Sequence, residues 1–495
     1  MGNLGKDKIA SHPALVLILG TVLYLCLGFA QPGMNFDSAT YSVIARNMVD
    51  EGRWFNPTYT DFYLNDFVTH PPLVMWANAV VFSALGANDS TARLFGALCT
   101  LGAIIAAFSL GKEIGGKSYG FLSGLVLLLT YNFIQNGNSG LLDVPLSFFM
   151  LVVLWGIARM QNSNLRWKPH IIAGVALGCA FLSKGVVSAP VWATLVAIAL
   201  FIRRDWLRSY RFWCIPGIAI LLVSVYLVMD QIYAGGVFLR SYFFHQIWNH
   251  WIRSDGQTGS GWWFFTYRFA QLYLPFIVLL PVGMYMMVRK KVILLFPAAI
   301  TLIVFFLFSS AATVLYHHYF CPAYALSAPV IALPLYYLLK KNHVQWLTVG
   351  FAIVWLSLGV GVTAAGVRIH TVRAPEIYNA RESLQSLLRD HPTRYGIFVH
   401  PGNPRWNYVA NTAWYWRSDI KQLSSIEEAA LLLRSDMRFA YLFVESMNRL
   451  TGEEAKGLHL SSFLEADGIV VYISVGGVSG KRAEYYNTQL RCNFP

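Results

Sequence analysis

Charged side chains are scarce in this chain of 495 residues. They make up 13% of it, against roughly 25% in an ordinary soluble domain, while hydrophobic residues make up 56%. The mean hydropathy is +0.47. This composition excludes an ordinary soluble enzyme and predicts a polytopic membrane protein.

Cysteine is also rare, and no two cysteines have the spacing of a metal or redox site. Most lie inside apolar runs, which indicates small core residues. There is no internal repeat, no low-complexity tract, and no P-loop or dinucleotide fingerprint. The six cysteines are Cys26, Cys99, Cys179, Cys214, Cys321 and Cys492.

The net charge of +13 does not indicate nucleic-acid binding. The basic residues fall in short clusters between apolar runs, as they do where loops of a membrane protein face the cytoplasm. Lys6 and Lys8 precede the first run, and no clear cleavage site follows at Leu27-Gly28-Phe29-Ala30-Gln31. We therefore expect an uncleaved first helix and no nucleic-acid partner.

Apolar runs of roughly 15 to 23 residues predict about eleven transmembrane helices. A further stretch, 72–86, is short and begins with two prolines. If 72–86 lies on the outer surface, all six basic clusters face the cytoplasm; if it spans, the later clusters face outward. The first arrangement places the N-terminus in the cytoplasm and the C-terminal region outside. The predicted spans are 13–30, 92–110, 119–136, 141–160, 170–184, 186–202, 212–229, 266–288, 292–311, 322–340 and 345–366.

The composition after about residue 370 is that of a soluble domain. Residues 395–399, 440–444 and 469–473 are typical of strands, and Ser424 or Ser425 is a suitable N-cap for the helix that follows. We predict a membrane domain over 1–369 and a small α/β domain over 370–495.

Three charged residues lie beside predicted spans on the outer side. Asp37 opens a helical stretch, and it can cap that helix or act as an acid or base. Asp143 stands at the outer end of a span, where it can start the helix or serve a function that offsets the cost of a charge. Lys184, in a turn between two apolar runs, can snorkel or bind a lipid phosphate.

The loop 231–265 contains histidines among several tryptophans. The tryptophans are typical of an interfacial aromatic belt. His245 and His250 are candidates for a divalent metal site, although their spacing fixes no geometry. His317 and His318 stay open, because adjacent histidines on a helix point about 100° apart.

Several short motifs follow one another in an order that is more specific than any single piece. They are Asp37-Ser-Ala-Thr-Tyr41, Gly52-Arg-Trp54, Pro71-Pro72-Leu73-Val-Met-Trp76, Leu85-Gly86, Ala92-Arg93-Leu94, Leu142-Asp143 and Ser183-Lys184-Gly185. Over residues 13 to 340 this order resembles the membrane-embedded GT-C glycosyltransferases, in particular bacterial relatives of protein O-mannosyltransferases and of the lipid A aminoarabinose transferase. The resemblance implies a GT-C fold.

The resemblance also implies an enzyme that moves a sugar from a polyprenyl-phosphate carrier to an extracytoplasmic acceptor. It assigns catalytic roles to Asp37 and Asp143. Substrate-binding roles fall to Tyr41, His70, Lys184, His250, Arg253 and Tyr319, the last within a Tyr-x-x-Pro motif that ends at Pro322.

One motif departs from the family pattern. The relatives usually have Glu-Lys-Pro-Pro-Leu where this chain has Thr69-His70-Pro71-Pro72-Leu73. Thr69 removes a metal ligand, so no cofactor is assigned, and His70 either binds the carrier phosphate or joins His245 and His250 as a metal candidate.

These residues suit a single displacement at the anomeric carbon, with Asp37 as the base and inversion of configuration. The expected partners are a polyprenyl-phosphate sugar, membrane lipids and a glycan, lipid or protein acceptor, in the inner membrane of a bacterium. Two alternatives stay open: a transporter of lipid-linked sugars, although no repeats are present, and a non-catalytic relative that binds the carrier. The sequence names neither the sugar nor the acceptor.

Overall fold

The computed structural model divides into two units by its contacts, and each is described by itself. The membrane unit comprises Met1–Gln31, Trp54–Asn56 and Phe67–Ile369, and the C-terminal unit comprises Pro32–Arg53, Pro57–Asp66 and His370–Pro495. The residues described are 13–29, 31–60, 62–63, 67–162, 167–242, 262–310, 316–339, 350, 375–384, 395–399, 406–417, 419–436, 439–445, 448–466 and 469–474.

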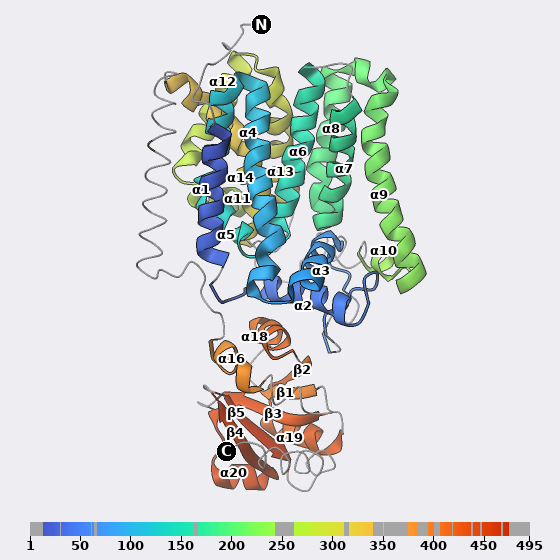
Figure 1. The fold of residues 1–495 in the computed structure, drawn as a ribbon, viewed down its shortest axis with the longest axis vertical. Coiled ribbons are helices and arrows are strands. Elements are labelled where there is room, and N and C mark those ends of the chain that lie inside the picture. The colour runs from blue at the N-terminus through green and yellow to red at the C-terminus, as the bar shows by residue number, and fades with distance from the viewer. Residues whose placement is uncertain are drawn as a thin grey trace. The chain divides into compact units, whose positions relative to one another are not determined.

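The membrane unit is built of helices that run side by side (Figure 1). Among the described residues, six helices are long and apolar enough to cross a membrane, or seven if one bent pair is counted as a span. The chain is therefore a multi-pass membrane protein, and the count of eleven spans stays a prediction. The helices are α1 (Pro13–Phe29), α3 (Leu73–Leu85), α4 (Asp89–Leu128), α5 (Tyr131–Gly137), α6 (Asp143–Asn162), α7 (Trp167–Lys184), α8 (Ala189–Ala197), α9 (Tyr210–Ala234), α10 (Val237–Ser241), α11 (Trp262–Leu272), α12 (Leu279–Arg289), α13 (Phe296–Ser310) and α14 (Cys321–Leu338).

α4 contains a helical hairpin rather than one straight helix. Gly115 and Gly116 leave the helical conformation, and Gly116 has a φ of 81°, which glycine adopts without strain. The two arms then pack closely, because a Cβ at Gly120 would lie 2.5 Å from the carbonyl oxygen of Phe108. Close approach through glycine is a common way to pack helices in membranes. The two spans predicted at 92–110 and 119–136 correspond to these arms, and α5 takes up the end of the second.

The span predicted at 266–288 is bent. The segments Phe265–Leu272 and Phe276–Arg289 meet at an angle of 117°. Pro275 lies at the break, where its missing N–H group cannot continue a helix. The span predicted at 345–366 lies almost wholly outside the described residues, and the stretch 72–86 forms the short helix α3.

The basic clusters of the described residues gather at one end of the membrane unit. At the last turn of α6, Arg159 donates to Glu113 at the turn of the α4 hairpin, over 3.0 Å. The helical segment η3 (Arg204–Arg208) follows the far end of α8. Lys290 lies after α12, with its Nζ 4.0 Å from the centroid of the Tyr337 ring near the end of α14. The opposite end carries the first residue of α6 and the last of α7.

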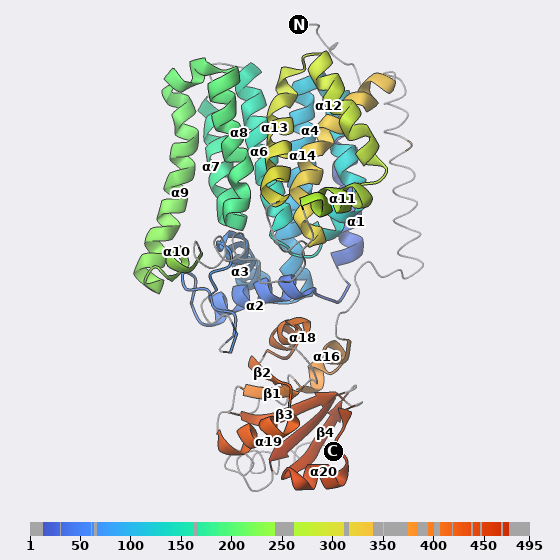
Figure 2. The ribbon, with the colours of Figure 1, turned by 180° about the vertical axis from the view of Figure 1, so that it is seen from behind.

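The C-terminal unit contains a five-stranded sheet in the order β2-β1-β3-β5-β4. β1 pairs in parallel with β2 and β3, and β5 pairs antiparallel with β3 and β4. The turned view shows the same sheet with its helices (Figure 2). The strands are β1 (Tyr395–Val399), β2 (Asp419–Leu423), β3 (Phe439–Glu445), β4 (Leu460–Ala466) and β5 (Ile469–Ser474); the helices are α2 (Phe36–Asp50), α16 (Pro375–Asn379), α18 (Trp406–Asn411), α19 (Ile426–Ser435) and α20 (Gly452–Gly457).

The α/β character of this unit is confirmed. The strands predicted at 395–399, 440–444 and 469–473 correspond to β1, β3 and β5. Ser425 caps α19, since its side chain accepts a hydrogen bond from the backbone N–H of Glu428. Residues 32–53 and 57–66, which the sequence analysis places in the membrane domain, group with this unit by contacts. The boundary after residue 369 falls outside the described residues and stays a prediction.

Candidate functional site

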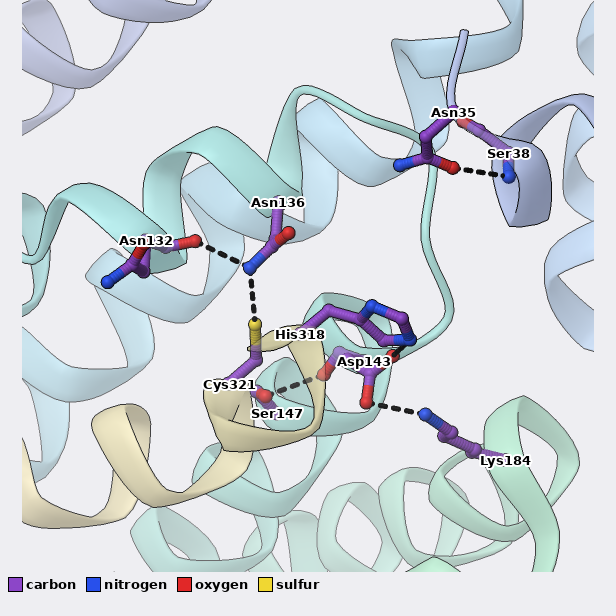
Figure 3. A network of polar contacts seen from close by, with 9 residues as sticks. All are labelled: Asn35, Ser38, Asn132, Asn136, Asp143, Ser147, Lys184, His318 and Cys321. Carbon is purple, nitrogen blue, oxygen red and sulfur yellow. Dashed lines mark hydrogen bonds and ion pairs between the residues drawn. The ribbon is translucent and has the colours of Figure 1, made fainter. Parts of the chain in front are cut away.

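A buried ion pair joins the start of α6 to the end of α7. The Nζ atom of Lys184 donates to Oδ1 of Asp143 over 2.6 Å (Figure 3). Their side chains are only 6% and 3% exposed. One turn into α6, the Ser147 hydroxyl donates to the backbone carbonyl of Asp143 over 2.6 Å. The two charges therefore balance each other where neither is hydrated by bulk water.

The helical segment η7 (His317–Phe320) contributes two rings to this cluster. Nε2 of His318 lies 3.9 Å from Oδ2 of Asp143. The Nζ atom of Lys184 lies 4.1 Å from the centroid of the Tyr319 ring, a cation–π distance. We call Asp143, Lys184, His318 and Tyr319 the polar cluster.

The buried Cys321 and the half-buried Asn136 border the cluster from neighbouring helices. Cys321 begins α14 and its Sγ accepts a hydrogen bond from Nδ2 of Asn136 over 3.5 Å (Figure 3). Cys321 is fully buried and belongs to the hydrophobic core, in agreement with the prediction of a small core residue. Asn136 also donates to the carbonyl of Asn132 within α5 over 2.7 Å, and its bond to Cys321 is the one that ties α5 to the start of α14.

The turn after Lys184 depends on glycine. Gly185 has a φ of 61°, and a Cβ there would collide with the hydroxyl of Tyr242. That hydroxyl accepts a hydrogen bond from the backbone N–H of Val186 over 2.9 Å. The sequence therefore fixes the direction in which the chain leaves Lys184.

His70 precedes α3 in the membrane unit, and its side chain is half-buried. Its ring centroid lies 6.4 Å from that of Phe67. Leu73 and Trp76, at the start of α3, pack against a buried cluster that includes Leu182 near the end of α7, and α3 and α7 are in contact. α3 thus lies against the helix that ends at Lys184.

Asp37 and Tyr41 lie one turn apart in α2, within the C-terminal unit. Of the two roles left open for Asp37, the capping role is wrong. α2 begins one residue earlier, at Phe36, and Asn35 is its N-cap, with Oδ1 accepting from the N–H of Ser38 over 2.8 Å (Figure 3). A short amide side chain is a strong N-cap, so the carboxylate of Asp37 is not required for that purpose.

The remaining predicted residues lie outside the part of the chain that the structure describes. These are His245, His250 and Arg253. Within the described residues, no group of three or more histidine, cysteine or acidic side chains could hold a metal ion. Among the residues described, His70 therefore belongs to no such group.

The structure adds His318 to the residues that sequence reasoning selected. The pair His317-His318 left both residues open, because two adjacent histidines give no geometry. The signal that points to His318 is its place immediately before Tyr319 and three residues before Cys321, where η7 leads into α14. Only the fold shows that this turn meets the start of α6.

Sequence comparisons point to enzymes that use lipid-linked sugars. A family model described as dolichyl-phosphate-mannose-protein mannosyltransferase matches residues 69–229. The undecaprenyl phosphate-alpha-4-amino-4-deoxy-L-arabinose arabinosyl transferase of Shewanella sediminis is 24% identical over 286 residues, which are 56% of this chain and 51% of that protein. The enzyme of the same name from Pseudomonas aeruginosa is 24% identical over 256 residues, 50% of this chain and 45% of that protein. The chain spans about half the length of the curated relatives it matches.

Solved structures show the fold. ArnT from Cupriavidus metallidurans, bound to undecaprenyl phosphate, gives a TM-score of 0.69 at 15% identity and covers 93% of this chain and 98% of its own. The archaeal oligosaccharyltransferase AglB from Archaeoglobus fulgidus, in complex with an inhibitory peptide and a dolichol-phosphate, gives 0.53 at 12% identity, covering 88% and 69%. The GT-C fold expected from the motifs is confirmed.

Proposed function

We propose that this chain, which has the GT-C fold of membrane glycosyltransferases, moves a sugar from a polyprenyl-phosphate carrier to an acceptor on the extracytoplasmic side of a bacterial inner membrane. The single observation that carries the proposal is the buried pair of Lys184 and Asp143, with His318 and Tyr319, at one end of the helices. A bundle that only spans a lipid bilayer has no need of such a cluster, because each buried charge costs free energy.

The position of the polar cluster supports the proposed orientation. It lies at the end of the bundle opposite the basic residues at 112–117, 203–208 and 289–291. Loops rich in lysine and arginine stay in the cytoplasm, so the polar cluster would face the other side. We propose that the N-terminus is cytoplasmic and the C-terminal domain, predicted over 370–495, extracytoplasmic.

Lys184 has the chemistry to bind the carrier phosphate. Before the donor arrives, Asp143 offsets its charge. When the donor binds, its phosphate would contact the Lys184 ammonium group while Asp143 keeps its own contact with that group. Asp143 and the ring of Tyr319 would hold the ammonium group in place. Arg253 and His70 are proposed to add positive charge as the phosphate becomes a leaving group.

Asp37 is the proposed general base. As the acceptor oxygen attacks the anomeric carbon, the bond from that carbon to the phosphate oxygen breaks, and its electron pair goes to the phosphate. The proton of the acceptor hydroxyl passes to the carboxylate of Asp37. One displacement inverts the anomeric configuration. Asn35, not Asp37, is the N-cap of α2. Asp143 then has a positioning role, and His250 and Tyr41 are proposed to contact substrate.

The curated relatives are named for a pentosyl donor, and we propose a pentose as the sugar to test first. A hexose is the second choice, because the family model is described by mannose transfer. Both donors should be offered to the same preparation with lipid A, other glycans and lipid acceptors.

The test is transfer by the purified chain in proteoliposomes, using polyprenyl-phosphate pentose and hexose labelled in the sugar. We expect label to leave the carrier and appear covalently on an acceptor, with free polyprenyl phosphate formed in equal amount. Movement of intact donor between leaflets without bond cleavage would instead identify a transporter. Saturable donor binding with neither transfer nor movement would identify a non-catalytic relative.

A further inference from the structure

The helix that carries Asp37 is fastened to the C-terminal unit by buried hydrogen bonds. Arg46, in the third turn of α2, is 8% exposed. Its Nη1 atom donates to the carbonyls of Ala413 and Trp414 over 3.1 and 3.3 Å. Its guanidinium carbon lies 6.0 Å from the centroid of the Trp414 ring. A cation is thus buried on α2 against groups of its own unit, and the carboxylate of Asp50 lies 3.9 Å away.

The next residue makes a second attachment. Nδ2 of Asn47 donates to the carbonyls of Thr58 and Tyr59 over 3.1 and 2.9 Å. The segment that contains these carbonyls is itself tied to the sheet. The hydroxyl of Tyr63 accepts from the backbone N–H of Gln422 in β2 over 3.0 Å.

Aromatic packing completes this attachment. Phe62 lies against the rings of Tyr395 in β1 and Phe439 in β3, with centroids 5.0 and 5.6 Å apart. Trp416 packs against Phe443 of β3, with the ring centroids 5.0 Å apart and the rings tilted by 51°. Its Nε1 donates to the carbonyl of Ile377 over 2.9 Å. α2, the 57–63 segment and the sheet therefore share one set of buried contacts.

We infer that the C-terminal unit positions the carboxylate of Asp37, and that Arg46 is the positioning residue through which it does so. The inference rests on the proposed function of Asp37. Arg46 is nine residues after Asp37, which corresponds to roughly 13 Å along an α-helix. A helix of this length moves as a stiff rod, so the buried guanidinium sets where the first turn can lie. The C-terminal domain is then part of the catalytic machinery rather than an appendage.

The arginine is suited to this role by its geometry. A single planar group reaches two successive carbonyls of η8 (Thr412–Trp416) while resting near an aromatic ring. Lysine at this position can reach one carbonyl but cannot reproduce the planar contact. Methionine keeps much of the length and loses all donors.

The test compares Arg46→Met and Arg46→Lys with Arg449→Met in proteoliposomes. Arg449 lies in the same unit, and its pair with Glu465 is about half exposed at both side chains. Two measurements are made on each variant: amide hydrogen exchange of residues 36–50, and kcat and KM for the labelled donor. The rate of hydrogen exchange reports how firmly α2 is held, and it does so whether or not Asp37 is the catalytic base.

We expect Arg46→Met to speed exchange across 36–50 while leaving β1, β3 and β5 protected. Its kcat should fall between about tenfold and 100-fold, as for a misplaced catalytic group, with donor KM within about threefold. The exchange rate and kcat of Arg46→Lys should lie between those of Arg46→Met and those of wild type. Arg449→Met should match wild type in both measurements. If Arg46→Met unfolds the sheet as well, the milder Arg46→Lys decides by the same criteria.

Faster exchange in 36–50 with wild-type kcat would overturn the inference, because α2 would then be free to move without effect on transfer. Unchanged exchange in both Arg46 variants would overturn it too, since Arg46 would not fix the helix. Failure of the proposed function looks different: Asp37→Asn would retain transfer, whatever the exchange data show.

Discussion

At the scale of single residues, the pair of Lys184 and Asp143 is the least exposed ion pair among the described residues. A buried pair is weak evidence for stability, because desolvation of both ions offsets their attraction. Removal of one partner is a different case, since it leaves an isolated buried charge. Loss of one partner should therefore destabilise the protein more than loss of both, and this difference can separate a structural role of the pair from a role in transfer.

A double-mutant cycle uses that asymmetry. Lys184→Met removes the ammonium partner of the Asp143 carboxylate, leaving His318 at 3.9 Å, and should cost about 3–5 kcal/mol of stability. Asp143→Leu, which removes the carboxylate partner of Lys184, should cost about as much. The double variant should regain most of that stability, measured by thermal unfolding in detergent, but transfer should stay lost. Recovery of transfer together with stability would show that the pair only holds α6 and α7 together.

Variants of His70 can show what the departure from the family pattern at this position does. If its imidazolium meets the carrier phosphate, transfer should fall as the pH rises through roughly 6 to 7, where imidazole ordinarily loses its proton. His70→Lys keeps a cation over that range, so it should stay active and flatten the profile. The control is His459→Lys, at an exposed turn of the C-terminal unit.

The opposite outcome for His70 is equally clear. If His70→Lys is inactive, and elemental analysis finds a divalent metal in wild type but not in the variant, His70 is a metal ligand. A protonated ammonium cannot coordinate a metal.

At the scale of helices and strands, long apolar runs and regular strands could be predicted, and breaks within helices could not. The runs at 92–110 and 119–136 gave two spans, but only the fold shows that Gly115 and Gly116 turn one arm back onto the other. The bend near Pro275 was missed because composition stays apolar across it. β2 and β4 were missed because Asp419–Leu423 and Leu460–Ala466 are rich in polar residues.

In the candidate site too, single residues could be predicted from the sequence, but their contacts could not. Asp143 and Lys184 were found because a charge beside an apolar run is conspicuous. Their contact could not be predicted, since 41 residues separate them along the chain. For Asp37 the sequence left open a capping role and an acid or base role, and only the backbone geometry shows that Asn35 is the cap of α2.

The hairpin in α4 gives a prediction about packing. Gly120→Ala would place a methyl group 2.5 Å from the carbonyl oxygen of Phe108, and overpacking of this kind costs about 1–3 kcal/mol. Gly217→Ala in α9 is the control, since a Cβ there meets nothing within 4 Å. Thermal unfolding should shift downward for Gly120→Ala only; equal midpoints would mean that the two arms separate more readily than the structure indicates.

At the scale of the whole molecule, the account requires one orientation in the membrane. Single cysteines at 112–117, 203–208 and 289–291 should react with an impermeant thiol reagent only from the cytoplasmic side. Cysteines at the exposed positions 52 and 53 and at the exposed positions of α20 should react only from outside. Labelling of 112–117 from outside would place the polar cluster in the cytoplasm and exclude an extracytoplasmic acceptor.

The most direct measurement is transfer by Asp37→Asn in proteoliposomes beside wild type, with donor binding determined in parallel. The control is Asp205→Asn, whose carboxylate is exposed and paired with Arg203. The account predicts that Asp37→Asn binds donor as wild type does and loses transfer by about 10²–10⁴-fold, the usual contribution of a general base, while Asp205→Asn stays active. Transfer by Asp37→Asn within about tenfold of wild type would contradict the account.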